Sequence, residues 1–234
     1  MKISIVLYAQ HYRLAVQCLD RIQQFTSIPY ELLIVADDGL DDVINFLTFE
    51  YEHRVIRNEG KSVASAYNLG AAASSGERIV FLRDQIMVSE GWLEALSGCL
   101  DKHPNAAIAG PMMNDVSGEQ RISVLFKNKE HLYQSAPILR LNKSDVYTRV
   151  PRLISLLMMI PRECYDRIGG FDERFEIETY EDDDLCYRAL MLNYDLYIAE
   201  GSVVFWLEPP PMDPNDPVDL ATVRRCAVGA FGSR

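Results

Sequence analysis

The sequence predicts a three-layer α/β domain, with helices on both faces of a mostly parallel central sheet. Short apolar runs without helical period, beginning with Ile3 to Tyr8, alternate with segments whose apolar residues recur at helical spacing. The run Leu153 to Ile160 is apolar throughout, which is typical of a strand buried on both faces. A chain of 234 residues that is 48% hydrophobic can also bury a substantial core.

The first two predicted strands end at places suited to binding. Ile3 to Tyr8 leads into a helix whose apolar face recurs from Ala15 to Phe25. The second strand, Glu31 to Ala36, stops at Asp37 and Asp38, and the glycine after them suits a tight turn. Ligands of open α/β sheets bind at such strand ends. The two acids therefore mark a candidate site, although the alternative that they only cap the next segment stays open.

The alternation continues through the middle of the chain. We predict a strand at His53 to Arg57, a helix at Val63 to Ser74, a strand at Glu77 to Leu82, a helix carrying Leu93, Leu96 and Leu100 on one face, and a strand at Ala106 to Ala109 that ends in a turn at Gly110 and Pro111. The strand at Glu77 to Leu82 ends at Arg83, Asp84 and Gln85.

Beyond residue 111 the pattern is less regular. Polar residues dominate from Met112 to Val150, and then the run Leu153 to Ile160 predicts a buried central strand. Pro161 suits the first position of a helix that reaches Ile168. Residues 196–199 and 202–205 are apolar again and predict a last strand region. We place one domain at 1–208 and a Pro-rich extension at 209–234, which reads as a linker or wrap with a short helix at 219–228.

Charge and cysteine content narrow the class of protein. Lys and Arg number 23 against 34 Asp and Glu, a net charge of −11, which argues against nucleic acid or an anionic membrane surface as partner. The five cysteines lack C-x-x-C spacing and mostly fall in predicted helices, so we expect buried thiols in a reducing compartment. The apolar run at the N-terminus is far too short to span a membrane. We expect a cytoplasmic protein, and a homodimer is an open alternative to a monomer.

A dense group of acids, Glu181 to Asp184, lies where a turn becomes a helix. The turn begins with the pair Gly169 and Gly170, and the helix is indicated by the period of Leu185, Ala189 and Leu192. Acids in a first helical turn complement the helix dipole, so simple capping explains them without any chemistry. The alternative is a catalytic carboxylate.

The order Gly-Gly-Phe-Asp-Glu-Arg-Phe, a short spacer and Tyr-Glu-Asp-Asp-Asp-Leu resembles the C-terminal signature of family 2 glycosyltransferases. The resemblance implies a GT-A fold, a Rossmann-like nucleotide-binding architecture, with a nucleotide-sugar-binding half at 1–111 and an acceptor and catalytic half at 112–208. It makes Asp182 the general base, with Glu181 beside it. Such a base deprotonates an acceptor hydroxyl during inverting transfer of a sugar from a nucleotide sugar, which we take to be a UDP-sugar.

Two upstream segments extend the resemblance. The acids after the second strand match a motif that faces the nucleobase, and the stretch Asn58 to Gly70 matches a segment that packs against the donor site. The implied nucleotide-sugar-binding residues are Tyr8, Asp37, Asp38, Asn58, Lys61, Asn68, Arg83 and Asp84. Four residues of the polar region are candidate contacts to a carbohydrate or other hydroxyl acceptor: Arg121, Lys127, His131 and Arg140. Each of these is also an ordinary surface residue type.

The sequence departs from the family at the metal site. Family members carry a D-x-D motif where this chain has Arg83-Asp84-Gln85, and many have a metal-binding histidine where it has Trp206. Asp84 is the one acid left to hold Mg²⁺ or Mn²⁺, which want several hard oxygen ligands. We expect Arg83 to neutralise part of the diphosphate charge instead. Alternatively, Arg83 is a structural residue and the chain is a non-catalytic binder of a nucleotide sugar or carbohydrate. A nucleotidyltransferase is disfavoured, because Ala9 to Arg13 lacks the glycines of a phosphate loop.

Overall fold

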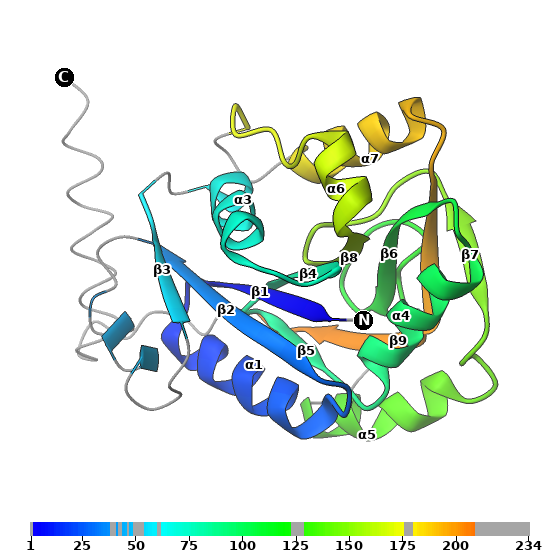
Figure 1. Ribbon diagram of the computed structural model, residues 1–234. Coiled ribbons are helices and arrows are strands. Elements are labelled where there is room, and N and C mark those ends of the chain that lie inside the picture. The colour runs from blue at the N-terminus through cyan, green and yellow to red at the C-terminus, as the bar shows by residue number, and fades with distance from the viewer. Residues whose placement is uncertain are drawn as a thin grey trace.

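The structure is a computed structural model that describes residues 2–37, 41, 44–45, 47–48, 54–59, 62–122, 129–175 and 180–208. Asp38, Lys61, Lys127 and the predicted extension at 209–234 lie outside these ranges. The described residues form a nine-stranded sheet in the order β3-β2-β1-β4-β8-β6-β9-β5, and β7 pairs with β9 (Figure 1).

The first half of the sheet is parallel. Its strands are β1 (Ile3–Ala9), β2 (Tyr30–Asp37), β3 (Arg54–Asn58) and β4 (Arg78–Arg83). β8 (Leu157–Pro161) runs antiparallel to both β4 and β6 (Ala106–Met113), and β6 is parallel to β9 (Asp195–Trp206). β6 and β9 therefore run in the same direction as the first four strands. Only β8, β5 (Ile86–Val88) and β7 (Tyr147–Val150) run in the opposite direction, which confirms the predicted mostly parallel sheet.

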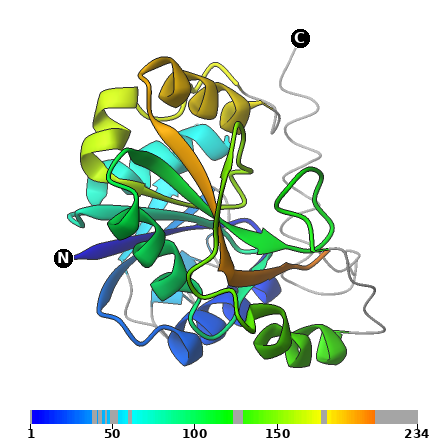
Figure 2. The same cartoon turned by 90° about the vertical axis from the view of Figure 1, so that its right-hand side faces the viewer.

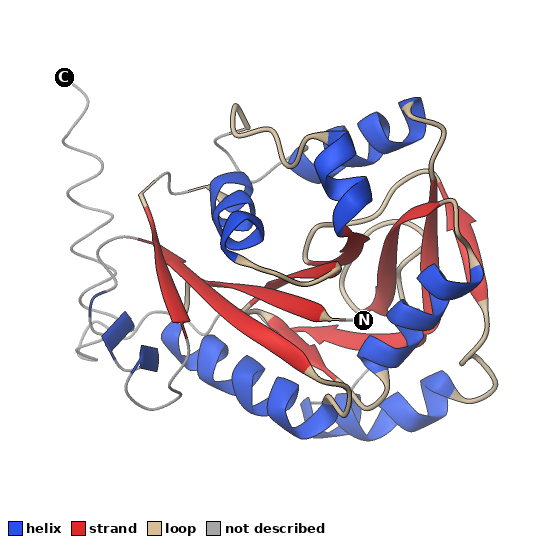
Figure 3. Ribbon diagram, in the orientation of Figure 1, coloured by secondary structure: helices blue, strands red, loops and turns tan. Residues whose placement is uncertain are grey.

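Helices cover both faces of the sheet, as Figure 1 shows by label and Figure 3 by colour. On one face lie α1 (Tyr12–Phe25), α4 (Trp92–Lys102) and α5 (Lys129–Arg140); on the other lie α3 (Val63–Ala73), α6 (Arg162–Ile168) and α7 (Glu181–Met191). In the orthogonal view of Figure 2, β9 (orange) runs from the end of α7 towards α5.

The sheet divides the interior into two apolar cores. Ile5 and Leu7 of β1 pack with the buried face of α1, whereas Val6 and Tyr8 pack on the α3 side. This alternation is the two-residue period of a strand, and both sets are buried because each face is covered by helices. The continuous apolar runs of the sequence have this cause, and the predicted three-layer fold is confirmed.

Two predicted boundaries were wrong. The strand predicted at Leu153 to Ile160 begins only at Leu157, because the N–H groups of residues 153–155 bond to side chains rather than to a neighbouring strand. The strand predicted to end at Ala109 continues through Gly110 and Pro111 to Met113. A shift of register against β9 falls between Gly110 and Met112, and such an irregularity is where a strand tolerates proline. The helix α5 and the short strands β5 and β7 were not predicted.

Two further observations concern predicted properties. Cys18, Cys99, Cys164 and Cys186 are free thiols, and all but Cys164 are buried. Within the described ranges, no helix combines the length and the apolar character that crossing a membrane requires.

Candidate functional site

The ends of three adjacent parallel strands meet at Asp37. The hydroxyl of Tyr8 on β1 donates to Asp37 Oδ1 at 2.9 Å, and Asn58 Nδ2 at the end of β3 donates to the same oxygen at 2.9 Å. All three side chains are buried, and Asp37 keeps 8% exposure. A carboxylate that accepts two side-chain hydrogen bonds is held in one orientation. The structure thus brings together three of the predicted binding residues.

Asn58 also connects this cluster to the start of α3. Its Oδ1 accepts a hydrogen bond from the Ser65 hydroxyl at 2.7 Å. Ser62 and Ser65 form a capping box, in which each side chain bonds the other residue's backbone N–H. The capping box satisfies donors that would otherwise lack partners in the first turn of the helix. The chain therefore enters α3 directly beside Asp37.

Arg83 lies at the end of β4, across β1 from Asp37. Its Nη2 donates to Gln10 Oε1 at 2.5 Å, and its guanidinium carbon lies 6.0 Å from the centre of the Tyr8 ring. Between β1 and β4 the chain order of the sheet reverses, since β2 and β3 lie on one side of β1 and β4 on the other. Ligands bind at such switch points in open α/β sheets. Arg83 is therefore a cation at the place where an anionic ligand is expected.

Asp84 has a different role from Arg83. Its carboxylate is fully buried, and Oδ2 accepts the backbone N–H groups of Gln10 and His11 at 2.7 and 2.5 Å. These bonds tie the loop after β1 to the end of β4. The Asp84 carboxylate thus accepts hydrogen bonds from the protein backbone. The sequence had identified Asp84 as the one acid left to hold a metal ion.

The described residues do not fit a site for a hard divalent cation. Among them, no group of three His, Cys, Asp or Glu side chains lies close enough together to hold a metal ion. Trp206 pairs with Ile86 in the sheet, and its backbone exchanges two hydrogen bonds with the Asn114 side chain. Mg²⁺ and Mn²⁺ need several oxygen ligands, and the positions of Arg83, Gln85 and Trp206 offer no carboxylate.

Glu181 and Asp182 open α7 as a buried pair, with exposures of 5% and 7%. The Ser155 hydroxyl donates to Glu181 Oε1 at 2.8 Å, and the Ser155 N–H donates to Asp182 Oδ2 at 3.2 Å. Asp182 Oδ1 accepts the N–H of Asp183 at 2.8 Å. Burial raises the pKa of both carboxyl groups, and the bonds from Ser155 oppose that rise. The positive charge of Arg83 is a further, smaller cause that lowers the pKa of Glu181. The loop that holds the acids also contacts the strand ends, because the Arg83 N–H donates to the carbonyl of Leu156, next to Ser155, at 3.1 Å.

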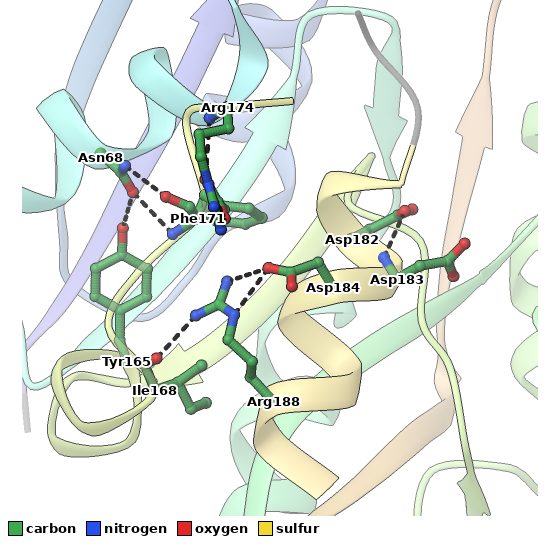
Figure 4. A network of polar contacts seen from close by, with 10 residues as sticks. Asn68, Tyr165, Ile168, Phe171, Arg174, Asp182, Asp183, Asp184 and Arg188 are labelled. Atoms are coloured by element: carbon green, nitrogen blue, oxygen red, sulfur yellow. Dashed lines mark hydrogen bonds and ion pairs between the residues drawn. The ribbon is translucent and has the colours of Figure 1, made fainter. Parts of the chain in front are cut away.

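The Gly-Gly-Phe turn before α7 is held by Asn68 of α3 (Figure 4). Asn68 Oδ1 accepts the Tyr165 hydroxyl at 2.6 Å and the Phe171 N–H at 3.0 Å, and Nδ2 donates to the Phe171 carbonyl at 2.9 Å. Gly170 has φ +73°, and an added Cβ would lie 3.0 Å from Asn68 Oδ1, so this position needs glycine. The Asn68 amide is therefore engaged in holding the turn, and its role in binding a nucleotide sugar stays a prediction.

The other end of the same turn is joined to α7. Arg188 donates to Asp184 Oδ2 at 2.6 and 2.8 Å and to the carbonyl of Ile168 at 2.8 Å (Figure 4). These bonds set α7 against the end of α6. The acidic run thus has members with different contacts: Glu181 and Asp182 bond to the loop before β8, whereas Asp184 is part of the helix packing.

Two of the four acceptor candidates lie on the face of the sheet opposite to the acid pair. His131 and Arg140 belong to α5, which covers the face of the sheet opposite to α7 (Figure 1). Arg121 is exposed and lines a cavity of about 270 Å³ beside Met112, Lys143 and Glu200. Sequence reasoning also missed Ser155 and Tyr67, whose hydroxyl donates to the Ser155 carbonyl at 2.8 Å. Both fall within apolar or small-residue segments that carry no signal of a polar site.

Comparisons with known proteins agree with this architecture. The model of the family described as "Glycosyltransferase like family 2" matches residues 3–203, so the chain belongs to this family. The chain is 28% identical over 172 residues to the pre-mycofactocin glycosyltransferase of Mycobacterium tuberculosis; the match covers 70% of this chain and 35% of that protein. The chain therefore spans about a third of the length of this curated relative.

Two solved structures share the fold. The structure of GalNAc-T7 with UDP, GalNAc and Mn²⁺ aligns with a TM-score of 0.69 at 15% identity, covering 89% of this chain and 44% of that one. The mannosyltransferase PcManGT from Pyrobaculum calidifontis, in complex with GDP-Man and Mn²⁺, aligns with a TM-score of 0.62 at 16% identity, covering 99% of this chain and 65% of that one. These neighbours confirm the GT-A fold that the sequence predicted.

Proposed function

We propose that the protein transfers a sugar from a nucleotide sugar to an acceptor hydroxyl with inversion at the anomeric carbon. The observation that carries this proposal is the pair Glu181 and Asp182, buried at the start of α7 and bonded to Ser155, whose neighbour Leu156 accepts the backbone N–H of Arg83 at the switch point of the sheet. Membership of the family and the fold of its solved neighbours support the same activity.

Asp182 is the general base in this proposal. It removes the proton of the acceptor hydroxyl while that oxygen forms a bond to the anomeric carbon, and the bond from that carbon to the diphosphate breaks on the opposite side. The two backbone N–H groups that it accepts hold its carboxylate in place, and its oxygens retain further lone pairs for an acceptor. Burial raises its pKa, which makes its anion a stronger base than an exposed aspartate.

The donor nucleotide binds at the ends of β1, β2 and β3 in this proposal. Asp37, oriented by Tyr8 and Asn58, is placed to accept hydrogen bonds from the base or ribose. Asp38 and Lys61 belong to the same predicted pocket but lie outside the described residues. We take the donor to be a UDP-sugar; one solved neighbour contains UDP and another GDP-Man, so the panel of donors tested must include both bases.

Arg83 takes over charge neutralisation at the diphosphate. A guanidinium can donate bidentate hydrogen bonds to phosphate oxygens, and these charge-assisted bonds strengthen in a crevice shielded from water. The Asp84 carboxylate is occupied by backbone donors, so it does not compete for this cation. The protein should therefore bind UDP with little dependence on a divalent metal.

A panel of UDP-, GDP- and other nucleotide sugars tests the function by thermal shift and by release of the nucleoside diphosphate, in EDTA and in Mn²⁺. Binding and turnover of one donor in both conditions supports the proposal. UDP titration of Arg83→Ala should show affinity weaker by about 10- to 100-fold, the loss of a charged hydrogen bond, whereas Arg167→Ala on the exposed face of α6 should not. A large gain of wild-type affinity in Mn²⁺, with no loss in Arg83→Ala, refutes the role of Arg83.

The missing carboxylates favour one other function, a non-catalytic binder of a nucleotide sugar or carbohydrate. The same panel separates the two. A donor that stabilises the protein but yields no nucleoside diphosphate, with water or with any hydroxyl acceptor, supports the binder and overturns the transferase.

A further inference from the structure

The segment 153–156 is a loop whose backbone is bonded to groups from several other parts of the fold. It precedes β8 and lies outside the strand, although three of its four residues are apolar. Its hydrogen bonds join Leu153 N–H to Cys186 Sγ, Ile154 N–H to Gln120 Oε1, Ser155 C=O to the Tyr67 hydroxyl, and Leu156 C=O to the Arg83 N–H. A loop held at successive residues by partners from four elements or loops has little freedom to move.

Ser155 is the residue of this loop that bonds both acids, and it does so through two different groups, its backbone N–H and its side-chain hydroxyl. Asp182 accepts from backbone N–H groups on each of its oxygens, one from Ser155 and one from Asp183. Glu181 Oε1 accepts from the Ser155 side-chain hydroxyl. A change of the Ser155 side chain therefore removes the bond to Glu181 and leaves the bonds to Asp182 in place.

We propose that Ser155 is a positioning residue that orients the acid pair for transfer through its hydroxyl bond to Glu181. This inference rests on the proposed function, since it gives the pair its chemical task. Ser155 itself lies 4% exposed behind the acids, so it acts through them and not on the substrate. Ser155 is itself held from the side of the proposed nucleotide-sugar site. The Tyr67 hydroxyl donates to the Ser155 carbonyl, and the Tyr67 ring lies edge-on to the Tyr8 ring, with 6.4 Å between ring centres.

The ionisation of Glu181 and Asp182 should depend on the Ser155 hydroxyl, because few other groups of the described residues offset the negative charge of this acid pair. Arg83 and Asp182 face Glu181, and Asp183, Arg152 and the thiol of Cys186 surround Asp182. Arg152 is already paired with Asp183, with 2.5 Å between Nε and Oδ1. Losing a donor disfavours the charged form of a buried carboxyl, and two neighbouring carboxyls titrate as a pair. The acidic limb of the activity profile should therefore move to higher pH when the hydroxyl is lost.

The test measures kcat, donor KM and the pH profile of nucleotide release for Ser155→Ala. We expect kcat to fall about tenfold, within the cost of misplacing a catalytic group, with donor KM unchanged and the acidic limb moved to higher pH. Ser155→Thr keeps the hydroxyl and should keep the limb at its wild-type position. If Ser155→Ala is too unstable to assay, Ser155→Cys, a weak donor of similar size, should give the same shift. Carbon NMR of the Glu181 carboxyl should report a raised pKa in Ser155→Ala independently of activity.

Ser202→Ala is the matched control. This serine is fully buried in β9, and within the described residues its hydroxyl has no hydrogen-bond partner, so its removal should leave kcat and the limb unchanged. If the wild type is active and the acidic limb of the pH profile does not move in Ser155→Ala, the positioning role alone is overturned. This holds even if kcat falls, because loss of packing would lower kcat without moving the limb. A wild type that turns over no donor overturns the proposed function and this role with it.

Discussion

Replacing Asn68 by alanine should destabilise the protein by about 3 kcal/mol. The change removes the partner of the Tyr165 hydroxyl and of the Phe171 N–H and carbonyl. Phe171 and Tyr165 are buried, at 3% and 7% exposure, so water cannot fully replace the lost bonds. Each such bond contributes about 1 kcal/mol net, and the fourth bond of Asn68, to exposed Glu173, adds little. The sum corresponds to a fall in Tm of about 6 to 12 °C for a chain of this size.

Urea unfolding measures this loss as a lower midpoint at an unchanged slope. Asn68→Asp is the conservative variant: it keeps the oxygen that accepts two of the three bonds, loses the donor to Phe171 and places a charge near Glu173, so it should destabilise the protein by less than Asn68→Ala. Gln24→Ala on the exposed face of α1 is the control and should change stability by less than about 0.5 kcal/mol. A loss below about 1 kcal/mol in Asn68→Ala would show that the Gly-Gly-Phe turn is held by other contacts.

Four further predictions concern the acids and α7. Asp182→Asn should lower kcat by about 10²- to 10⁴-fold while donor affinity, measured by calorimetry, stays at the wild-type value; wild-type kcat in this variant would end the assignment of the base. Because burial raises the pKa of Asp182 above its ordinary 3.8, wild-type kcat should fall as pH decreases through that raised pKa, and a limb at or below pH 3.8 would contradict this. Asp37→Ala should weaken UDP binding, since it removes the acceptor oriented by Tyr8 and Asn58; equal affinity would place the pocket elsewhere. Tyr180 has φ +74°, in the left-handed region that strains any residue with a Cβ. Tyr180→Gly should therefore stabilise the protein by about 0.5 to 1 kcal/mol, which is the strain relieved minus the entropy cost of ordering a more flexible glycine. A lower urea midpoint in this variant would mean that the Tyr180 side chain stabilises the protein by more than the backbone strain destabilises it.

The sequence was most informative where one physical cause controls the pattern. Continuous apolar runs arise from burial on both faces, and so the parallel strands β1, β2 and β4 were predicted to within a residue or two at either end. The start of α7 could be predicted because an acidic first turn precedes an apolar period. The end of β2 at Asp37 followed from the change from apolar to acidic residues.

The sequence was least informative where distant residues decide the structure. Three of the four residues from Leu153 to Leu156 are apolar like the strand that follows, yet N–H groups of this segment bond to partners such as Gln120 and Asp182, which lie far away along the chain. No local pattern records such partners, so Ser155 could not be found. For the same reason Asn68 carried a family signal without revealing its bonds to the turn. The cytoplasmic location, the homodimer and the extension at 209–234 stay predictions.

The position of β8 in the sheet has a consequence for how the chain can fold. β8 belongs to the segment 112–208, yet it lies between β4, which comes from the segment 1–111, and β6, most of which does. A fragment ending at residue 111 would leave the long edge of β4 without its neighbour, and unpaired edges promote aggregation. Tyr67 and Ser155, which meet across this boundary, are 88 residues apart. Contacts between residues so far apart in the sequence slow folding. The acid pair should therefore reach its final geometry late, after Tyr67 and Ser155 have come together.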